Sequence, residues 1–318
     1  DFNSKSDLKK RWQSRLAIVS PILAYTENDA AVFLLRSRPC QIHDLVQETY
    51  LMPFFMLLLI AAVQGITEFL PVSSSGHLVL IPLVTDHPYQ GRTIDVAAHV
   101  GTLIAVAAYL RADLLRMARG LLTFGRRHST DTHLGLLIVI ATLPVISVGY
   151  FVNKVDPAWL LNLETLAIAN LVFALLLWLA DKFGATARTM GDLKFNQAVL
   201  IGLAQIFALI PGASRSGVTM MAARYLGFGR LTAARFSLLL SLPTIAGAGV
   251  LKTYDLVQTG DLALGADALI VSALSCLFAF AAIDLMMRWL ARADFTIFVG
   301  YRLALGIVLL VVIQTGYL

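Results

Sequence analysis

Long apolar runs separated by short polar segments dominate the chain from Met52 onward. A membrane-spanning helix needs roughly 20 mostly apolar residues. Runs of about this length occur at about 94–110, 134–152, 162–180, 236–251, 266–287 and 296–314. The pattern therefore predicts an all-α polytopic membrane protein with about six full spans.

Two further apolar stretches, at about 54–84 and 198–226, are interrupted near the middle by Pro, Gly and Ser. Each is too long for one span and barely long enough for two. A break in the backbone at membrane depth is tolerated only where protein or a water-filled cavity satisfies the freed N–H and C=O groups. The two broken stretches are therefore where we expect function.

The two broken stretches also resemble each other. Gln64 and Gly76 in the first, and Gln205 and Gly217 in the second, are both 12 positions apart, and each stretch has a Pro and ends in Ser-x-Ser-Gly. Such a repeated pattern at broken hydrophobic segments is typical of a duplicated half. It predicts pseudo-repeats at about 52–180 and 196–318.

Basic residues between the runs predict the orientation of these halves. Arginine and lysine in the loops 111–133 and 181–197 assign both loops to the cytoplasm. Counting spans from these loops puts both ends of 54–84 outside and both ends of 198–226 inside. We therefore expect an inverted-topology repeat, in which two broken, re-entrant helical hairpins dip from opposite faces and meet near the midplane.

Residues 1–51 differ from the rest of the chain. They hold 13 charged residues, and their apolar stretches are too short to span a membrane. One interpretation is a disordered or interfacial polar extension. The interpretation we favour is a non-native segment upstream of a start at Met52, leaving 52–318 as a single transmembrane domain.

Composition narrows the class of protein further. Charged residues make up 14% of the chain and apolar residues 58%, against about 25% charged in an ordinary globular domain. Soluble enzymes and nucleic-acid binders are excluded, because so little charge cannot cover a water-facing surface. The net charge of +5 fits basic cytoplasmic loops. The two cysteines, Cys40 and Cys276, are too few for a disulfide framework.

The first break carries an acid, an amide, hydroxyls and an imidazole. Gln64 and Glu68 are spaced i, i+4 and share one face of a helix. A buried carboxylate is costly unless it is paired or metal-bound. The groups that follow are Ser73, Ser74, Ser75 and His77. Any one serine at such a break is more often a helix cap than a nucleophile.

The second break carries a cation, Arg215, at membrane depth. Its neighbours are Ser214, Ser216, Gly217 and Thr219. A helix that restarts after the break directs free N–H groups at the gap, which suits an anion, and a guanidinium matches phosphate oxygens. Together the two breaks suit binding and cleaving a phosphate ester or anhydride beside a lipid. Outside the breaks, we expect His99 to be structural and Arg302 to snorkel or pair near a span end.

These motifs resemble those of the bacterial undecaprenyl-diphosphate phosphatases, the bacitracin-resistance family. Gln64-x-x-x-Glu68 and the segment 71–77 are similar to its (Glu/Gln)-x-x-x-Glu and Pro-x-Ser-Ser-x-Gly-His motif. The segment 211–217 matches its second motif, Pro-Gly-x-Ser-Arg-Ser-Gly. The resemblance covers about 52–318.

The resemblance implies a multi-pass enzyme of the bacterial plasma (inner) membrane, with an active site open to the periplasm. It implies removal of the terminal phosphate of undecaprenyl diphosphate, giving the undecaprenyl phosphate that is recycled in peptidoglycan synthesis, and dependence on Mg²⁺ or Ca²⁺. The family's functional residues fall on Glu68, Ser74, His77, Ser214, Arg215 and Thr219, and many members have Glu in place of Gln64.

In the predicted mechanism, Arg215 and the backbone N–H groups near Ser216 and Gly217 hold the terminal phosphate. A divalent ion near Glu68 and Gln64 bridges diphosphate oxygens. Ser74 is the candidate nucleophile, with Glu68 or His77 taking its proton and His77 protonating the leaving group. A phosphorylated His77 and a metal-activated water stay open as alternatives.

A competing hypothesis is a transporter or flippase of a polyprenyl phosphate, because secondary transporters also use inverted repeats with broken helices. Under either hypothesis the partners are a polyprenyl lipid and the membrane, with no nucleic acid. The sequence is also compatible with a homo-oligomer.

Overall fold

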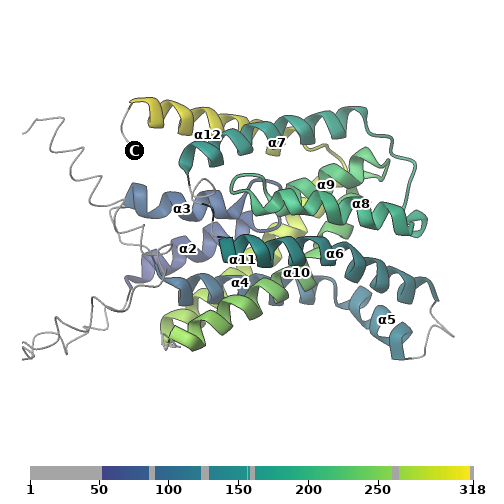
Figure 1. The fold of residues 1–318 in the computed structure, drawn as a ribbon, viewed down its shortest axis with the longest axis horizontal. Coiled ribbons are helices and arrows are strands. Elements are labelled where there is room, and N and C mark those ends of the chain that lie inside the picture. Colours follow the sequence, from purple (N-terminus) through teal and green to yellow (C-terminus); the bar gives the residue numbers. More distant parts are fainter. Residues whose placement is uncertain are drawn as a thin grey trace, which may run out of the picture. The chain divides into compact units, whose positions relative to one another are not determined.

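The computed structural model describes residues 52–85, 90–122, 129–155, 157, 162–259 and 265–315 (Figure 1). Its helices are α2 (Phe54–Thr67), α3 (Ser74–Thr85), α4 (Arg92–Tyr109), α5 (Arg111–Leu122), α6 (Ser129–Val155), α7 (Leu163–Phe183), η5 (Met190–Asp192), α8 (Phe195–Gln205), η6 (Ile206–Leu209), α9 (Arg215–Tyr225), α10 (Arg230–Thr259), α11 (Ala266–Leu290) and α12 (Thr296–Thr315). Within these ranges no strand is present apart from one isolated bridge between Arg188 and Phe228. The expectations for residues 1–51 lie outside the described residues.

The predicted spans are confirmed as helices. Five helices are long and apolar enough to cross a membrane, namely Thr130–Val155, Leu163–Phe183, Arg230–Val250, Ala266–Leu290 and Thr296–Thr315. A sixth span comes from α4, which passes the same test when paired with α5, although the two helices are bent by 77°. The fold is therefore the all-α polytopic membrane protein that the pattern of apolar runs predicts.

The two interrupted stretches form the expected broken hairpins. In the first, α2 ends at Thr67 and α3 begins at Ser74; in the second, α8 and η6 end at Leu209 and α9 begins at Arg215. The helices of each hairpin are too short to cross a membrane alone. Figure 1 shows α2 and α3 toward one end of the bundle and α8 and α9 toward the other, as expected for an inverted repeat.

The halves of the repeat are interlocked. Helix α2 packs on α11, α8 packs on α6, and α7 packs along α12, so each contact joins the first half to the second. Glycines allow close approach where helices cross. A Cβ atom at Gly101 would lie 2.1 Å from the carbonyl oxygen of Ser272, and one at Gly202 would lie 2.5 Å from that of Ala141. Small residues at such crossings are typical of membrane helix packing.

The interpretation of 111–133 as a loop is wrong. Residues Arg111–Leu122 form α5, and α6 already begins at Ser129. The segment was read as a loop because arginines interrupt its apolar positions. Its leucines nevertheless recur at helical spacing and leave one side of the helix apolar.

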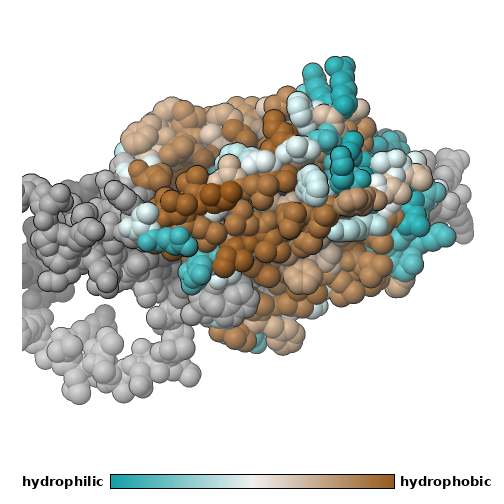
Figure 2. All heavy atoms as spheres, turned by 90° about the horizontal axis from the view of Figure 1, so that it is seen from above, coloured by the Kyte–Doolittle hydropathy of each residue, from teal (hydrophilic) through white to brown (hydrophobic). Residues whose placement is uncertain are grey.

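The surface matches a protein embedded in lipid. Large apolar side chains are exposed along most of the helices. Figure 2 shows hydrophobic side chains over most of the visible face, with hydrophilic side chains gathered toward one end. An apolar surface of this extent would be unstable in water and is stable in a bilayer.

Candidate active site

The two breaks share one unusual backbone feature at equivalent positions. Ser73 and Ser214 both have positive φ, 72° and 69°, and both directly precede a restarting helix. The Ser214 side chain accepts a hydrogen bond from the N–H of Gly217 at 3.2 Å. Matching hydroxyl pairs lie 3.4 Å apart between Ser73 and Ser75 and 3.1 Å apart between Ser214 and Ser216. Positive φ is uncommon for serine. Because it occurs at the equivalent serine of each break, both breaks are specific turns and not irregular loops.

The carboxylate of Glu68 is the centre of the site. It is buried and accepts hydrogen bonds from Gln64 Nε2 at 3.0 Å and from the Ser74 hydroxyl at 2.8 Å. Arg215 Nη2, from the second break, donates to Glu68 Oε1 at 3.1 Å. The Arg215 guanidinium also lies over the Phe69 ring, 5.8 Å from its centroid. The structure therefore brings together the acid, the amide, one serine and the guanidinium that the motifs single out.

A cavity of about 240 Å³ opens at this cluster. It is lined by Glu68, Ser73, Ser74, Ser75, His99, Val145, Ala208, Leu209, Ser214, Arg215, Thr244, Ile245 and Ala248. Both breaks contribute, as do α4, α6 and α10. The lining combines polar and charged side chains with aliphatic ones, which suits an anionic headgroup attached to a hydrocarbon chain.

The two histidines near the first break are placed differently from expectation. His77 does not line the cavity. Its Nδ1 donates to the carbonyl of Ser73 at 2.7 Å, and its ring stacks on Tyr301, with Nε2 2.5 Å from the hydroxyl. His99 does line the cavity, with Nε2 4.0 Å from Glu68 Oε2 and Nδ1 donating to the Asp95 carbonyl at 2.7 Å. The sequence predicts that His99 is structural. Its position facing Glu68 is therefore a feature that sequence reasoning missed.

The remaining predicted residues of the second break hold the backbone together. Ser216 donates to the carbonyl of Leu70 at 2.8 Å and so ties the second break to the first. The Thr219 hydroxyl donates to the Arg215 carbonyl at 2.9 Å and lies 2.7 Å from the Ser237 hydroxyl. None of Ser216, Gly217 and Thr219 lines the cavity. Their position indicates that they orient Arg215.

Arg302, in α12, is fully buried behind both breaks. Its Nε donates to Asn170 Oδ1 at 2.9 Å, and its Nη2 donates to the carbonyls of Gly212 and Ala213 at 2.8 and 3.0 Å. Its Nη1 donates to the carbonyl of Pro71 at 3.4 Å. Arg302 therefore pairs inside the protein and does not snorkel. One signal was present in the sequence, because Asn170 is an amide in the middle of the apolar run 162–180.

The donor atoms beside Glu68 fit a hard divalent cation. Gln64 Oε1 is buried and has no hydrogen-bond partner among the described residues. It belongs to the amide whose Nε2 donates to Glu68. Mg²⁺ is usually held by one or two carboxylates, waters and substrate phosphates. The part of the chain that the structure describes contains no group of three His, Cys, Asp or Glu side chains that would hold a metal by itself, so phosphate oxygens would have to complete the ligand set.

Comparisons with known proteins show the family of the chain. The family described as "Bacitracin resistance protein BacA" matches residues 57–308, which include both breaks. The chain belongs to this family. An undecaprenyl-diphosphatase of Maricaulis maris (strain MCS10) is 47% identical over 267 residues, covering 82% of this chain and 99% of the relative.

Two further BacA-family relatives are similar over the same extent. An undecaprenyl-diphosphatase of Alcanivorax borkumensis is 45% identical over 267 residues, covering 81% of this chain and 98% of its own. Another, of Roseobacter denitrificans, is 43% identical over 263 residues, covering 82% of this chain and 98% of the relative. The match spans nearly the whole length of each relative, so the likeness extends over the complete transmembrane fold and not just over the two motifs.

Proposed function

We propose that the chain hydrolyses the terminal phosphate of undecaprenyl diphosphate, giving undecaprenyl phosphate and inorganic phosphate. The observation that carries the proposal is the contact between Glu68, Ser74 and Arg215 at one cavity between the two breaks. A nucleophile, its proton acceptor and a phosphate-binding cation are the groups that phosphoryl transfer requires. The names of the relatives support the same reaction.

In this proposal the diphosphate occupies the cavity and the prenyl chain extends into the membrane. The Arg215 guanidinium binds oxygens of the terminal phosphate and stabilises the negative charge of the transition state. The polar side chains of the lining hold the headgroup, and the aliphatic ones, which include Val145 and Ile245, contact the first part of the prenyl chain. Ser73, Ser75 and Ser214 line the same cavity and offer further hydroxyls to phosphate oxygens.

The chemical steps begin at Ser74. Its oxygen attacks the terminal phosphorus while its proton passes to Glu68, which already accepts its hydrogen bond at 2.8 Å. The bond from phosphorus to the bridging oxygen breaks, and undecaprenyl phosphate leaves. The proton on Glu68 passes to the imidazole that protonates the leaving oxygen, so that Glu68 is again a carboxylate. Water then attacks the phosphoserine and gives a proton to Glu68, the bond from phosphorus to the Ser74 oxygen breaks, and Glu68 returns the proton to that oxygen as inorganic phosphate leaves. A direct attack by water would need no phosphoserine, and phosphorylation of His77 would leave the label on a histidine.

The leaving oxygen needs a proton, and two imidazoles are candidates. His77 is the donor that the motif suggests, but its nitrogens are engaged by Ser73 and Tyr301. His77 would have to turn away from Tyr301 to reach the cavity. His99 lines the cavity directly. Comparing His77→Gln with His99→Gln assigns the role: the variant of the proton donor loses more activity on undecaprenyl diphosphate than on an analogue with a good leaving group.

A divalent cation, Mg²⁺ or Ca²⁺, is part of the proposal. Glu68 and Gln64 Oε1 would hold it, and when bound it neutralises charge on the diphosphate oxygens. Removing it with a chelator is expected to abolish activity, with recovery on adding back Mg²⁺ or Ca²⁺. Activity that is unaffected by the chelator would contradict this part of the proposal.

We further propose that the protein lies in the bacterial inner membrane with the cavity open to the periplasm. The basic residues Arg111, Arg116 and Arg119 at one end of α4 support a cytoplasmic location of that end. By the same rule the first hairpin, whose ends lie at the opposite end, faces the periplasm. Cysteine labelling from either side of intact cells tests this orientation.

The decisive experiment is phosphate release from undecaprenyl diphosphate by purified protein in detergent. Detergent removes the two compartments that transport needs, so release distinguishes hydrolysis from the transporter hypothesis, which the inverted repeat also supports. Glu68→Gln and Arg215→Ala should abolish release. The control Arg288→Gln removes an arginine that forms an exposed ion pair with Asp284 on α11 and should retain activity.

A second experiment identifies the nucleophile. Radiolabelled substrate is mixed with the protein and quenched early, and the phosphorylated peptide is sequenced. Label at Ser74, absent in Ser74→Ala, supports the mechanism above. Label on His77, or no label together with an active Ser74→Ala, would contradict it while leaving the hydrolase function in place.

A further inference from the structure

Helix α5 has an orientation unlike that of the spans. It follows α4 after a single residue and is bent away from it by 77°. Because α4 crosses the membrane, α5 runs close to the plane of the membrane at the end where α4 leaves it. Helix α5 lies at the end of the bundle that carries Arg111, Arg116 and Arg119, and Figure 1 shows the helix extending outward from that end.

The side chains of α5 divide into three faces. Asp113 and Gly120 are buried against the bundle. Leu115, Leu121 and Leu122 are 55%, 58% and 80% exposed. Arg116 and Arg119 are exposed on a third face, and Arg111, the first residue of the helix, is exposed on the same side as the leucines. A helix with one apolar face and one basic face is typical of segments that lie in the membrane interface.

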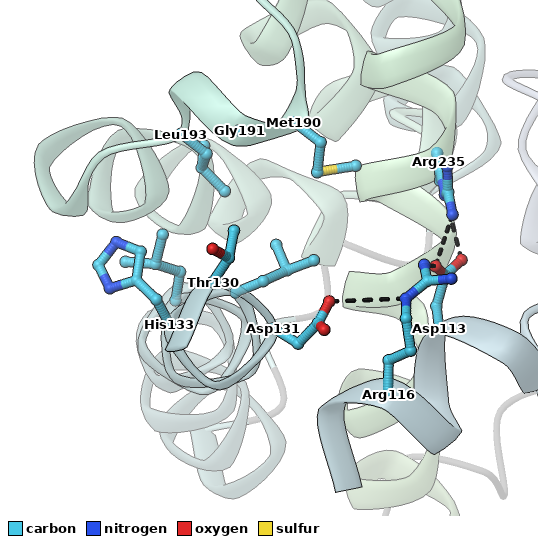
Figure 3. Close-up of a pocket in the computed structure, with 11 residues that line it drawn as sticks. Asp113, Arg116, Thr130, Asp131, His133, Met190, Gly191, Leu193 and Arg235 are labelled. Carbon is cyan, nitrogen blue, oxygen red and sulfur yellow. Dashed lines mark hydrogen bonds and ion pairs between the residues drawn. The ribbon is translucent and has the colours of Figure 1, made fainter. Parts of the chain in front are cut away.

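Charged contacts with α6 and α10 fix this orientation (Figure 3). Asp113 of α5 accepts hydrogen bonds from Arg116 on the same helix and from Arg235 on α10. Arg116 also reaches Asp131 on α6, with Nε 3.6 Å from Oδ1. A pocket of about 210 Å³ lies beside these groups, and Arg116 and Arg235 line it while each keeps close to half of its side chain exposed.

We propose that the exposed side of α5 binds the headgroups of anionic phospholipids in the membrane leaflet at the basic end of the bundle. The acyl chains lie under Leu115, Leu121 and Leu122, and the phosphates lie beside the arginines. Charge selects the partner, because α5 carries three arginines and one aspartate. The pocket itself is lined by two arginines and two aspartates, so the charge that selects an anionic headgroup comes from the exposed arginines of α5, since basic side chains at this membrane level attract anionic lipids. The proposal does not depend on the reaction catalysed at the other site.

The apolar half of the proposal is tested by spin labels. In a background of Cys40→Ser and Cys276→Ser, a label is attached at Leu121→Cys or, as a control on the same helix, at the exposed Ala112→Cys. In bilayers, the Leu121 label should be relaxed mainly by oxygen, which concentrates in lipid, and the Ala112 label mainly by a water-soluble nickel complex. Equal access of the nickel complex to both labels would overturn the proposal.

The charged half is tested by lipid retention. Protein from bilayers with and without phosphatidylglycerol is examined by native mass spectrometry. Arg119→Gln should weaken retention of phosphatidylglycerol about fivefold relative to phosphatidylcholine, from the usual contribution of one basic residue near an anionic surface. Arg288→Gln, which changes an exposed arginine on α11, should leave retention unchanged. Equal loss in both variants, or loss in neither, would overturn the proposal. Unchanged phosphate release in Arg119→Gln keeps this result separate from the catalytic one.

Discussion

The two broken hairpins have nearly the same backbone and quite different chemistry. Ser73 and Ser214 share a positive φ, and the hydroxyl pairs that follow have the same spacing in sequence. Four residues after the shared glutamine, however, the first hairpin has Glu68 and the second has Leu209. The residue after the turn is Ser74 in one and Arg215 in the other. A duplicated turn has thus kept its shape while its reactive groups became complementary, one half supplying the nucleophile and acid and the other the cation.

The largest effect is expected from the pair Glu68 and Leu209, which occupy equivalent positions and both line the cavity. Glu68→Gln should lower the rate of phosphate release about 10³-fold, because it removes the proton acceptor of Ser74 and the partner of Arg215. Leu209→Met should change the rate less than about threefold, since an apolar swap of similar volume is tolerated. Similar losses in both variants would mean that the shape of the cavity, and not the carboxylate of Glu68, explains the loss.

A large effect on stability is expected at Arg302, which serves both hairpins. Arg302→Met leaves the carbonyls of Pro71, Gly212 and Ala213 buried without this donor. Each such loss costs about 1–3 kcal/mol, so the melting temperature in detergent should fall by several degrees. Arg302→Lys keeps a donor and should recover part of the loss. An unchanged melting temperature in Arg302→Met would show that these hydrogen bonds do not hold the breaks.

The equivalent glycines Gly76 and Gly217 should respond with opposite signs. A Cβ at Gly217 would lie 2.8 Å from Arg302 Nη1, whereas one at Gly76 would have its nearest neighbour, Ser73 Oγ, at 3.4 Å. Gly217→Ala should therefore destabilise the protein by about 1–3 kcal/mol. Gly76→Ala should be neutral or stabilise α3 by up to about 1 kcal/mol, because alanine favours helices over glycine. Chemical denaturation in the same detergent measures both, and equal destabilisation would contradict the asymmetry.

The smallest effect is expected at the equivalent glutamines. Both amide atoms of Gln205 are buried without a hydrogen-bond partner among the described residues, whereas Gln64 donates to Glu68. Gln205→Leu should raise stability by about 1 kcal/mol, since an unpartnered amide is lost, with activity retained. Gln64→Leu should lower activity without raising stability. A Gln205→Leu variant that loses activity would reveal a polar role for the second hairpin that its contacts do not suggest.

The sequence predicts the spans and the breaks, because both depend on neighbouring residues. A span is seen from the length of an apolar run, and a break from the Pro, Gly and Ser residues that interrupt it. The contact between Glu68 and Arg215 was also accessible, through the internal repeat and the count of basic loops. The directions in which the side chains point were not accessible from the sequence. Whether His77 or His99 faces Glu68 depends on the rotation of α3 and α4 about their axes, which packing against α11 and α12 decides. The sequence predicts that Arg302 snorkels or pairs, but its partners were not accessible for the same reason, since they are 89 to 231 residues away in sequence.

The position of Arg302 also bears on how the two halves arose and fold. This arginine belongs to the second half, yet it donates to carbonyls in both hairpins, and its side-chain acceptor Asn170 belongs to the first. The first half alone therefore lacks the donor to its own turn, and the second half contains the donor but lacks the asparagine that pairs with it. If the chain were cut between α7 and α8, the fragments would have to insert in opposite orientations and find each other in the same bilayer. An ancestor of half the length would have needed an antiparallel twin before gene fusion joined the pair.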